Sequence, residues 1–95
     1  GRIDILDNVM TAQGCHFVSG GNGHSIERTD IPIMDQPTQQ RRIVIGPDVW
    51  YGANCVSMAN VGCGCVIGAG SVVVKDIPNW SVAVGNPAKV IKKRK

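Results

Sequence analysis

Two histidines and four cysteines are the side chains of this chain that could carry chemistry near neutral pH. A histidine can act as a general base because its ordinary pKa lies near the working pH of most enzymes. The histidines, together with the pair Cys63 and Cys65, also raise the hypothesis of a metal site, since imidazole and thiolate bind zinc. The cysteine spacing does not match a zinc ligand set, so we expect no metal.

The long segment 20–42 holds His24 and interrupts a repeat that fills most of the chain. Loops of this length in compact domains are usually functional or disordered. Disorder predicts few apolar side chains, yet Ile31, Ile33 and Met34 surround a proline. We therefore expect an ordered excursion that packs on a neighbouring chain. The other histidine, His16, follows an inward position of the repeat, and we expect a surface or interface residue there.

The stretch Ile43–Ile77 has small or apolar residues at every sixth position. An α-helix repeats every 3.6 residues and an open strand every two, so neither explains this period. Three short strands joined by three corners, with one hexapeptide per side, form a parallel β-helix and do explain it. Glycine, asparagine and aspartate suit the corners because they tolerate a positive φ. The first inward row comprises Ile43, Val49, Cys55 and Val61, and the second comprises Ile45, Tyr51, Ser57, Ile67 and Val73.

One irregularity interrupts this register. The step from Val61 to Cys65 spans four residues, where the register requires six. We expect such a shortened side to pull one corner inward or to bulge the stack of coils. Cys15, Cys55 and Cys65 fall at inward positions, where cysteine packs as a small apolar residue. Because unpaired buried thiols persist in a reducing environment, we expect a cytoplasmic protein.

We interpret the chain as a single domain over 1–95, with a first coil at 1–19, the long loop at 20–42, further coils at 43–77 and a C-terminal segment at 78–95. Ile3 and Ile5 would be exposed in the first coil, because a solenoid end needs a polar cap. We therefore expect a further N-terminal part of the domain, or a contact with another chain. At the other end, Ser81–Val84 predicts a last strand, 85–87 a turn, and 88–95 a short basic helix or a frayed tail.

The amino-acid composition and net charge reduce the number of folds and functions that fit this chain. Aromatic residues make up 4% of the 95 residues and 12 residues are glycine, which suits a thin solenoid better than a globular core. The net charge of +3 arises mostly from 89–95, but no binding motif accompanies it, so we expect no nucleic acid partner. No apolar run approaches the roughly 20 residues of a membrane-spanning helix. About three coils is near the minimum for a solenoid, so we expect an isolated monomer to be unstable.

Four segments carry a resemblance to a known family: GNGHSIERTDIPI at 21–33, IVIGPDVWYGAN at 43–54, VIGAGSVVVKDIP at 66–78 and AVGNPAKVIKK at 83–93. Together they resemble the hexapeptide-repeat acyltransferases, and among these the sugar O-acetyltransferases of the maltose and galactoside acetyltransferase type. The resemblance implies an all-β fold, a left-handed parallel β-helix, and a homotrimer with each active site between two β-helices. It also implies transfer of an acetyl group from acetyl-CoA to a hydroxyl of a sugar or polysaccharide precursor.

The resemblance further assigns roles to single residues. His24 would be the general base that takes the hydroxyl proton as the oxygen attacks the thioester carbon, with backbone N–H groups stabilising the oxyanion. No covalent acyl-enzyme is expected, so no cysteine is needed. The positions matched to acetyl-CoA binding are Ala53 and Ala69 beside pantetheine, Trp50 beside the groove, Val74 and Lys75 at a usual Thr-Lys pair, and Lys89 and Lys92 near the phosphates.

Two further functions were weighed against the O-acetyltransferase. One is a truncated or degenerate β-helix module that trimerises and binds CoA without catalysis, because the family's sugar-binding residues precede the stretch that this chain matches. The other is a hexapeptide-repeat protein of the γ-carbonic anhydrase type, which requires three metal-binding histidines per site. The chain has only two histidines, which argues against that function.

Overall fold

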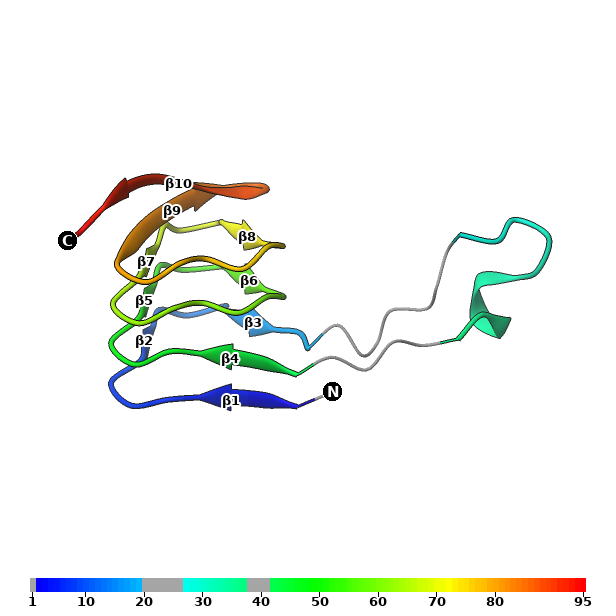
Figure 1. The fold of residues 1–95 in the computed structure, drawn as a ribbon, viewed down its shortest axis with the longest axis horizontal. Helices are drawn as coiled ribbons and strands as arrows, with labels where there is room; N and C mark the ends of the chain where they lie inside the picture. Colours follow the sequence, from blue (N-terminus) through cyan, green and yellow to red (C-terminus); the bar gives the residue numbers. More distant parts are fainter. Residues whose placement is uncertain (1, 20–26, 38–41) are drawn as a thin grey trace.

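Short strands wind into stacked coils in the computed structural model, which describes residues 2–19, 27–37 and 42–95 (Figure 1). A parallel β-helix is therefore confirmed, with the long loop inserted between the first and second coils. Within the described residues no helix has the length and apolarity needed to cross a membrane. The elements are β1 (Ile3–Ile5), β2 (Met10–Thr11), β3 (His16–Phe17), the 3-10 turn η1 (Ile33–Asp35), β4 (Ile43–Ile45), β5 (Trp50–Tyr51), β6 (Val56–Ser57), β7 (Val66–Ile67), β8 (Val72–Val73), β9 (Ser81–Gly85) and β10 (Ala88–Lys93).

The strands form three sheets, one on each side of the coils. Their orders are β1-β4, β10-β9-β7-β5-β2 and β3-β6-β8. Every pairing is parallel except the one between β9 and β10. Trp50 pairs with Val66 and Val66 with Val82, so one complete coil takes 16 residues. Equivalent residues of successive coils therefore stack directly above one another.

The two inward rows are confirmed except at Val61. Val61 pairs with Ile45 in the coil before it and with Ile77 in the coil after it, so it belongs to the second row. The first-row position is instead taken by Ala59, which is fully buried. The prediction of a shortened step at Val61–Cys65 was therefore wrong. The four-residue step lies between Ser57 and Val61, and it recurs between Val73 and Ile77, so it is a regular property of the coil.

Side chains close this shortened corner. The backbone N–H of Val44 donates to Asn60 Oδ1 at 2.8 Å, and the N–H of Asn60 donates to Asp76 Oδ1 at 2.9 Å. The Asn60 amide also donates to Asp76 Oδ2 at 3.3 Å. These bonds link each coil to the next where the ladder between short strands is interrupted, because backbone groups left unpaired there would be costly.

Residues with a positive φ turn the other two corners, as expected. The corner that precedes β2, β5, β7 and β9 uses Asn8, Asp48, Gly64 and Trp80. The corner that follows β2, β5 and β7 uses Gly14, Asn54 and Gly70. Trp80 has a φ of 60°, a conformation that bulky side chains rarely adopt. Its ring lies over Gly64, where an added Cβ would come within 2.2 Å of the Trp80 ring. Glycine at position 64 is therefore required by the tryptophan of the next coil.

The interior is a narrow column of aliphatic residues around one tyrosine. Tyr51 is fully buried, and its hydroxyl lies 3.0 Å from Ser57 Oγ, while the ring of Phe17 meets it edge-on at 5.1 Å. Burial raises the pKa of Tyr51 far above its ordinary value. The expected inward cysteines are confirmed: the thiols of Cys15, Cys55 and Cys65 each donate to a backbone carbonyl at 3.1 Å, and all four cysteines are free.

The C-terminal segment differs from its prediction. The strand expected at Ser81–Val84 is confirmed as β9, but the basic segment after the turn is neither a helix nor a frayed tail. It forms β10, which pairs antiparallel with β9. The free edge of β9 offers hydrogen-bonding partners, and Val90 and Ile91 favour a strand. The result is a hairpin that covers the last edge of the five-stranded sheet.

The described part of the long loop, 27–37, is organised around one buried polar side chain. Gln36 is 3% exposed, and its amide donates to the carbonyl oxygens of Arg28 and Ile31 at 2.8 and 3.2 Å. Ile33 and Met34 are exposed to 56% and 77%. The prediction that this loop packs on a neighbouring chain therefore stays a prediction.

Candidate functional site

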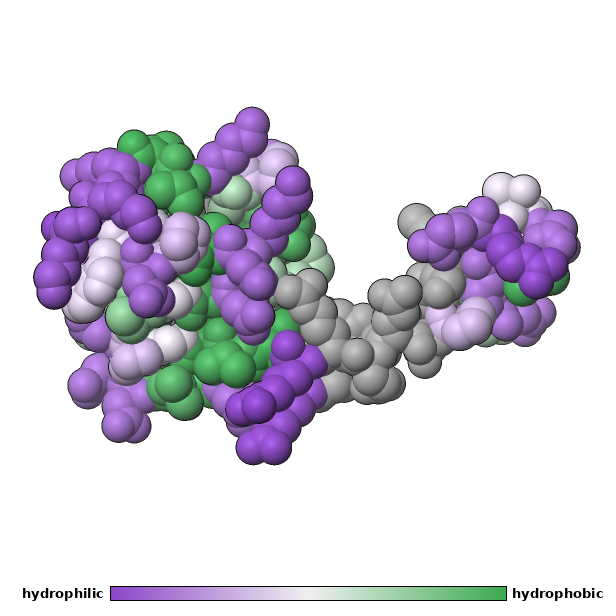
Figure 2. Space-filling model, in the orientation of Figure 1, coloured by the Kyte–Doolittle hydropathy of each residue, from purple (hydrophilic) through white to green (hydrophobic). Residues whose placement is uncertain are grey.

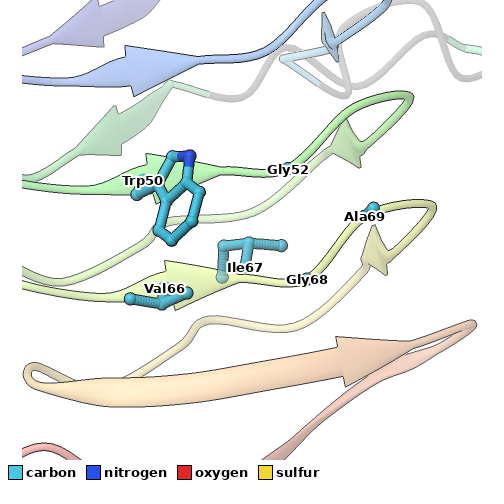
Figure 3. A pocket seen from close by; sticks show the side chains of 6 residues that line it. All are labelled: Trp50, Gly52, Val66, Ile67, Gly68 and Ala69. Atoms are coloured by element: carbon cyan, nitrogen blue, oxygen red, sulfur yellow. The ribbon is translucent and has the colours of Figure 1, made fainter.

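An open groove of about 210 Å³ lies on the outer face of the five-stranded sheet. In Figure 3 the indole of Trp50 extends from β5 along the sheet surface towards β7, above the groove floor. Trp50 is 54% exposed, so its ring is available to a ligand or to another chain. The groove is lined by Trp50, Gly52, Val66, Ile67, Gly68 and Ala69.

The groove follows two columns of outward-facing residues. Because the strands are parallel and in register, Met10, Trp50, Val66 and Val82 stack as one column. Gly52, Gly68 and Val84 stack beside it, two residues further along each strand. On the face shown in Figure 2, hydrophobic residues run up the coil stack between hydrophilic side chains. Met10 is 66% exposed at the lower end of the first column.

Glycine keeps the floor of the groove low. A Cβ built on Gly52 would lie 2.6 Å from the backbone nitrogen of Ala69, and one on Gly68 would lie 2.6 Å from Val84 Cγ1. Neither position has room for a larger residue without a shift of its neighbours. The floor is therefore a low strip without side chains at these two positions, which suits the close approach of a thin, elongated ligand.

Two lysines end the two columns. Lys89 pairs with Val84 and Lys92 pairs with Val82, and directly opposed residues of an antiparallel pair face the same side of the sheet. Residues three apart in a regular strand face opposite sides. Here the register shifts between Val90 and Lys92, which adds one residue and returns Lys92 to the groove face. The groove and the two lysines thus lie on the same face of one sheet, with the groove at β5 and β7 and the lysines beyond β9 on β10.

The structure brings together five of the residues predicted to bind acetyl-CoA. Ala53 and Ala69 are stacked at one corner beside the groove, where Gly70 N–H donates to the Ala53 carbonyl oxygen at 2.8 Å. With Trp50, Lys89 and Lys92 they lie on or next to one sheet. Val74 and Lys75 do not join them, because they follow β8 in the three-stranded sheet on another side of the coil. His24 lies outside the described residues, and His16 is exposed on β3 as expected.

Sequence reasoning missed two contributors to the groove. No site role was predicted for Gly52 and Gly68, whereas both line the groove. Their separation equals one 16-residue coil, the same as that of Trp50 and Val66. That spacing was the available signal, because Tyr51 and Ile67 of the second inward row are separated by the same 16 residues. Among the described residues there is no group of three or more His, Cys, Asp or Glu side chains that could hold a metal ion.

No protein-family model matches the chain. A Mycobacterium tuberculosis protein named "probable acetyltransferase" is 38% identical over 94 residues, which is 97% of this chain and 31% of that protein. A maltose O-acetyltransferase from Clostridium difficile has a similar structure, with a TM-score of 0.83 and 37% identity over 98% of this chain and 49% of its own. The chain is a relative of the hexapeptide-repeat acetyltransferases. Its β-helix is left-handed, as in these proteins, and the resemblance of its sequence motifs to them is confirmed.

Of two further similar structures, one contains coenzyme A and the other contains acetyl coenzyme A. A galactoside acetyltransferase in complex with coenzyme A has a TM-score of 0.81 and 34% identity, over 98% of this chain and 46% of its own. A hexapeptide-repeat acetyltransferase of Vibrio cholerae, in complex with acetyl coenzyme A, has a TM-score of 0.76 and 27% identity, over 99% and 55%. The chain thus spans between about a third and just over a half of the length of these four proteins.

Proposed function

We propose that the protein is an acetyl-CoA-dependent O-acetyltransferase that acts on a hydroxyl of a sugar or polysaccharide precursor. The groove at Trp50, on the same sheet face as Lys89 and Lys92, is the observation that carries this proposal. Its support comes from similar proteins, because the neighbours include a maltose O-acetyltransferase and a galactoside acetyltransferase with coenzyme A bound.

The groove fits the chemistry of coenzyme A in three parts. The pantetheine arm is thin, so it suits the low floor at Gly52 and Gly68. A larger side chain at either glycine would overlap the next coil, so glycine keeps this surface low. Ala53 and Ala69 continue this low surface around the corner. Lys89 and Lys92 supply point charges for the phosphates, whose attraction is screened by salt because both lysines are exposed.

His24 is the proposed general base. It takes the proton of the acceptor hydroxyl while the oxygen forms a bond to the thioester carbon. When the carbon–sulfur bond breaks, the proton held by His24 passes to the departing sulfur, so charge and atoms balance. A neutral imidazole is needed, and histidine supplies it near pH 7. None of the cysteines takes part, and the thiols of Cys15, Cys55 and Cys65 are turned inward to carbonyl oxygens.

A homotrimer would complete the site. The columns leave Met10 and Trp50 exposed to 66% and 54%, which is an apolar stripe that a second β-helix can cover. Val74 and Lys75 lie on another side of the coil, so in a ring of three chains they can face the groove of a neighbouring copy. We also infer that residues 1–95 form a single domain, because one stack of coils runs through them. The four free thiols lead us to infer a cytoplasmic location.

The test is steady-state transfer from acetyl-CoA to a panel of mono- and oligosaccharides, with His24→Ala as the matched control. We expect the variant to lose at least a hundredfold in kcat, which is the usual contribution of a general base. Equal rates for the two proteins would reject His24. Coenzyme A binding without turnover on any acceptor would instead support a β-helix module that binds the donor but does not catalyse.

A further inference from the structure

The end of the chain is fastened to the coils by Arg94. Its backbone N–H donates to the carbonyl oxygen of Trp80 at 2.7 Å, and its Nη1 donates to the carbonyl oxygen of Gly64 at 2.7 Å. The same Nη1 lies 3.9 Å from Asp48 Oδ2. Positions 48, 64 and 80 form one corner of three successive coils, so a single guanidinium spans three layers. The planar group also lies over the Trp80 ring, 5.8 Å from its centroid.

Lys93 and Lys95 reinforce this attachment. Lys93 Nζ donates to the Asn79 carbonyl oxygen at 2.9 Å and to Ser81 Oγ at 3.2 Å, and Lys95 Nζ lies 4.7 Å from the centroid of the Trp80 ring. We call Lys93, Arg94, Lys95 and Trp80 the clasp. The basic residues of the C-terminal segment thus divide into two sets: the clasp cations bind the coils, whereas Lys89 and Lys92 face the groove.

The two groove lysines depend on different supports. Strand β10 has only β9 as a hydrogen-bonded neighbour, and the register shift interrupts this ladder between Val90 and Lys92. Lys89 lies on the side of the shift nearer the turn, where three consecutive residue pairs hold the strand. Lys92 lies on the far side of the shift, where two residue pairs, its own and that of Lys93, precede Arg94. Edge strands with few hydrogen bonds open locally at small free-energy cost.

We propose that Arg94 is a positioning residue that holds the last part of β10 on the sheet and so keeps Lys92, but not Lys89, at the phosphate end of the groove. This inference rests on the proposed function, because it assumes that the groove binds coenzyme A. Without Arg94, residues 92–95 leave the sheet edge and Lys92 no longer faces the groove. Lys89 stays in place, since the hairpin turn and three residue pairs fix it.

The experiment measures the dissociation constant of coenzyme A for a set of single and double variants by calorimetry at low salt. Lys89→Ala and Lys92→Ala should each weaken binding about threefold to fivefold, as expected for an exposed ion pair. Arg94→Ala should weaken it to about the same extent as Lys92→Ala. The double variant R94A/K92A should bind no more weakly than K92A alone, whereas R94A/K89A should show the product of the two single losses.

Pantetheine, which lacks the nucleotide phosphates, is the control ligand, and its affinity should not change in any of these variants. Arg94→Lys keeps the charge but loses the planar group over the Trp80 ring, so it should lose part of the affinity that R94A loses, and it also serves where R94A unfolds at the assay temperature. Multiplicative losses for R94A and K92A, or an equal loss for pantetheine, would overturn the role of Arg94. If K89A and K92A leave the affinity for coenzyme A unchanged, the proposed donor site itself fails.

Discussion

Substitution of Gly52 by alanine tests whether the groove floor is as closely packed as the structure has it. The added Cβ would lie 2.6 Å from the backbone nitrogen and 2.8 Å from the Cα of Ala69. Both are backbone atoms of the next coil, so they cannot rotate away, and the two coils must move apart. Overpacking of this kind costs about 1–3 kcal/mol. We expect Gly52→Ala to lose about 2 kcal/mol of stability, or roughly 8–16 °C in the midpoint of thermal unfolding.

Gly68→Ala is the matched control, because it adds the same methyl group to the same column. Its Cβ would meet Val84 Cγ1 at 2.6 Å, which is the end of a side chain that is 37% exposed and able to rotate. We expect a loss below about 1 kcal/mol, partly offset by the lower entropy of the unfolded alanine chain. Val84→Ala should restore the stability of Gly68→Ala and should leave Gly52→Ala unchanged.

Thermal and urea unfolding at one fixed protein concentration measure these differences, since the stability of an oligomer depends on concentration. The affinity for coenzyme A of the folded variants supplies a second readout, because Gly52→Ala raises the floor beneath the ligand. The reasoning is refuted if Gly52→Ala is as stable as Gly68→Ala, or if Val84→Ala restores both variants equally.

Three further predictions follow from other parts of the coil. Asn60→Ala removes the acceptor of the Val44 N–H and should cost about 1–2 kcal/mol in urea unfolding, whereas Asn60→Asp keeps that acceptor but sets a second carboxylate beside Asp76, so it should cost at least as much at pH 7. Hydrogen bonds from Arg42 and then Arg2 hold the pKa of Asp4 below its ordinary value of 3.8, so its stabilisation is present above that value and is lost as the pH falls below it. Acid unfolding of Asp4→Asn should therefore start from a lower stability at pH 6 and fall less steeply below pH 4; identical curves would contradict the pairing. Burial raises the pKa of the Cys55 thiol, so a thiol reagent at pH 8 should label the half-buried Cys63 well before Cys55, and equal rates in the Cys63→Ser and Cys55→Ser variants would argue against the inward orientation.

The periodic part of the fold could be predicted because it is a local property of the chain. Inward positions such as Ile45, Tyr51 and Cys55 are separated by fixed steps along one strand path, and their burial follows from the side-chain types alone. The shortened corner was misplaced because Ala59 and Val61 are both small and apolar, so either fits the inward row. The choice depends on the bonds of Asn60 and Asp76 between coils, which are contacts between residues far apart in sequence.

The C-terminal strand and the groove depended on the same kind of distant contact. The segment 88–95 has residues that suit a helix and a strand about equally, and the free edge of β9 decided between them. Trp50, Ala53 and Ala69 were found through the family resemblance, and they lie at the groove. Val74 and Lys75 came from the same resemblance, but one chain alone does not bring them to that face. The groove floor requires the contact of each coil with the next, such as that of Gly52 with Ala69.

The shortened corner has a consequence for how this protein can vary. The long loop leaves the coils after Ser19 and returns before Ile43, at the position where later coils make their four-residue turn through Asn60 and Asp76. This junction is closed by side chains rather than by a residue with a positive φ, so the backbone there need not follow one fixed path. We expect additional peptide grafted beside Asn60 or Asp76, with the bonds of these side chains and the buried Ala59 kept, to leave the strands above and below in register. An added segment at either place would leave the coils on the same edge as the long loop. This edge is therefore a suitable place for engineering the proposed acceptor specificity.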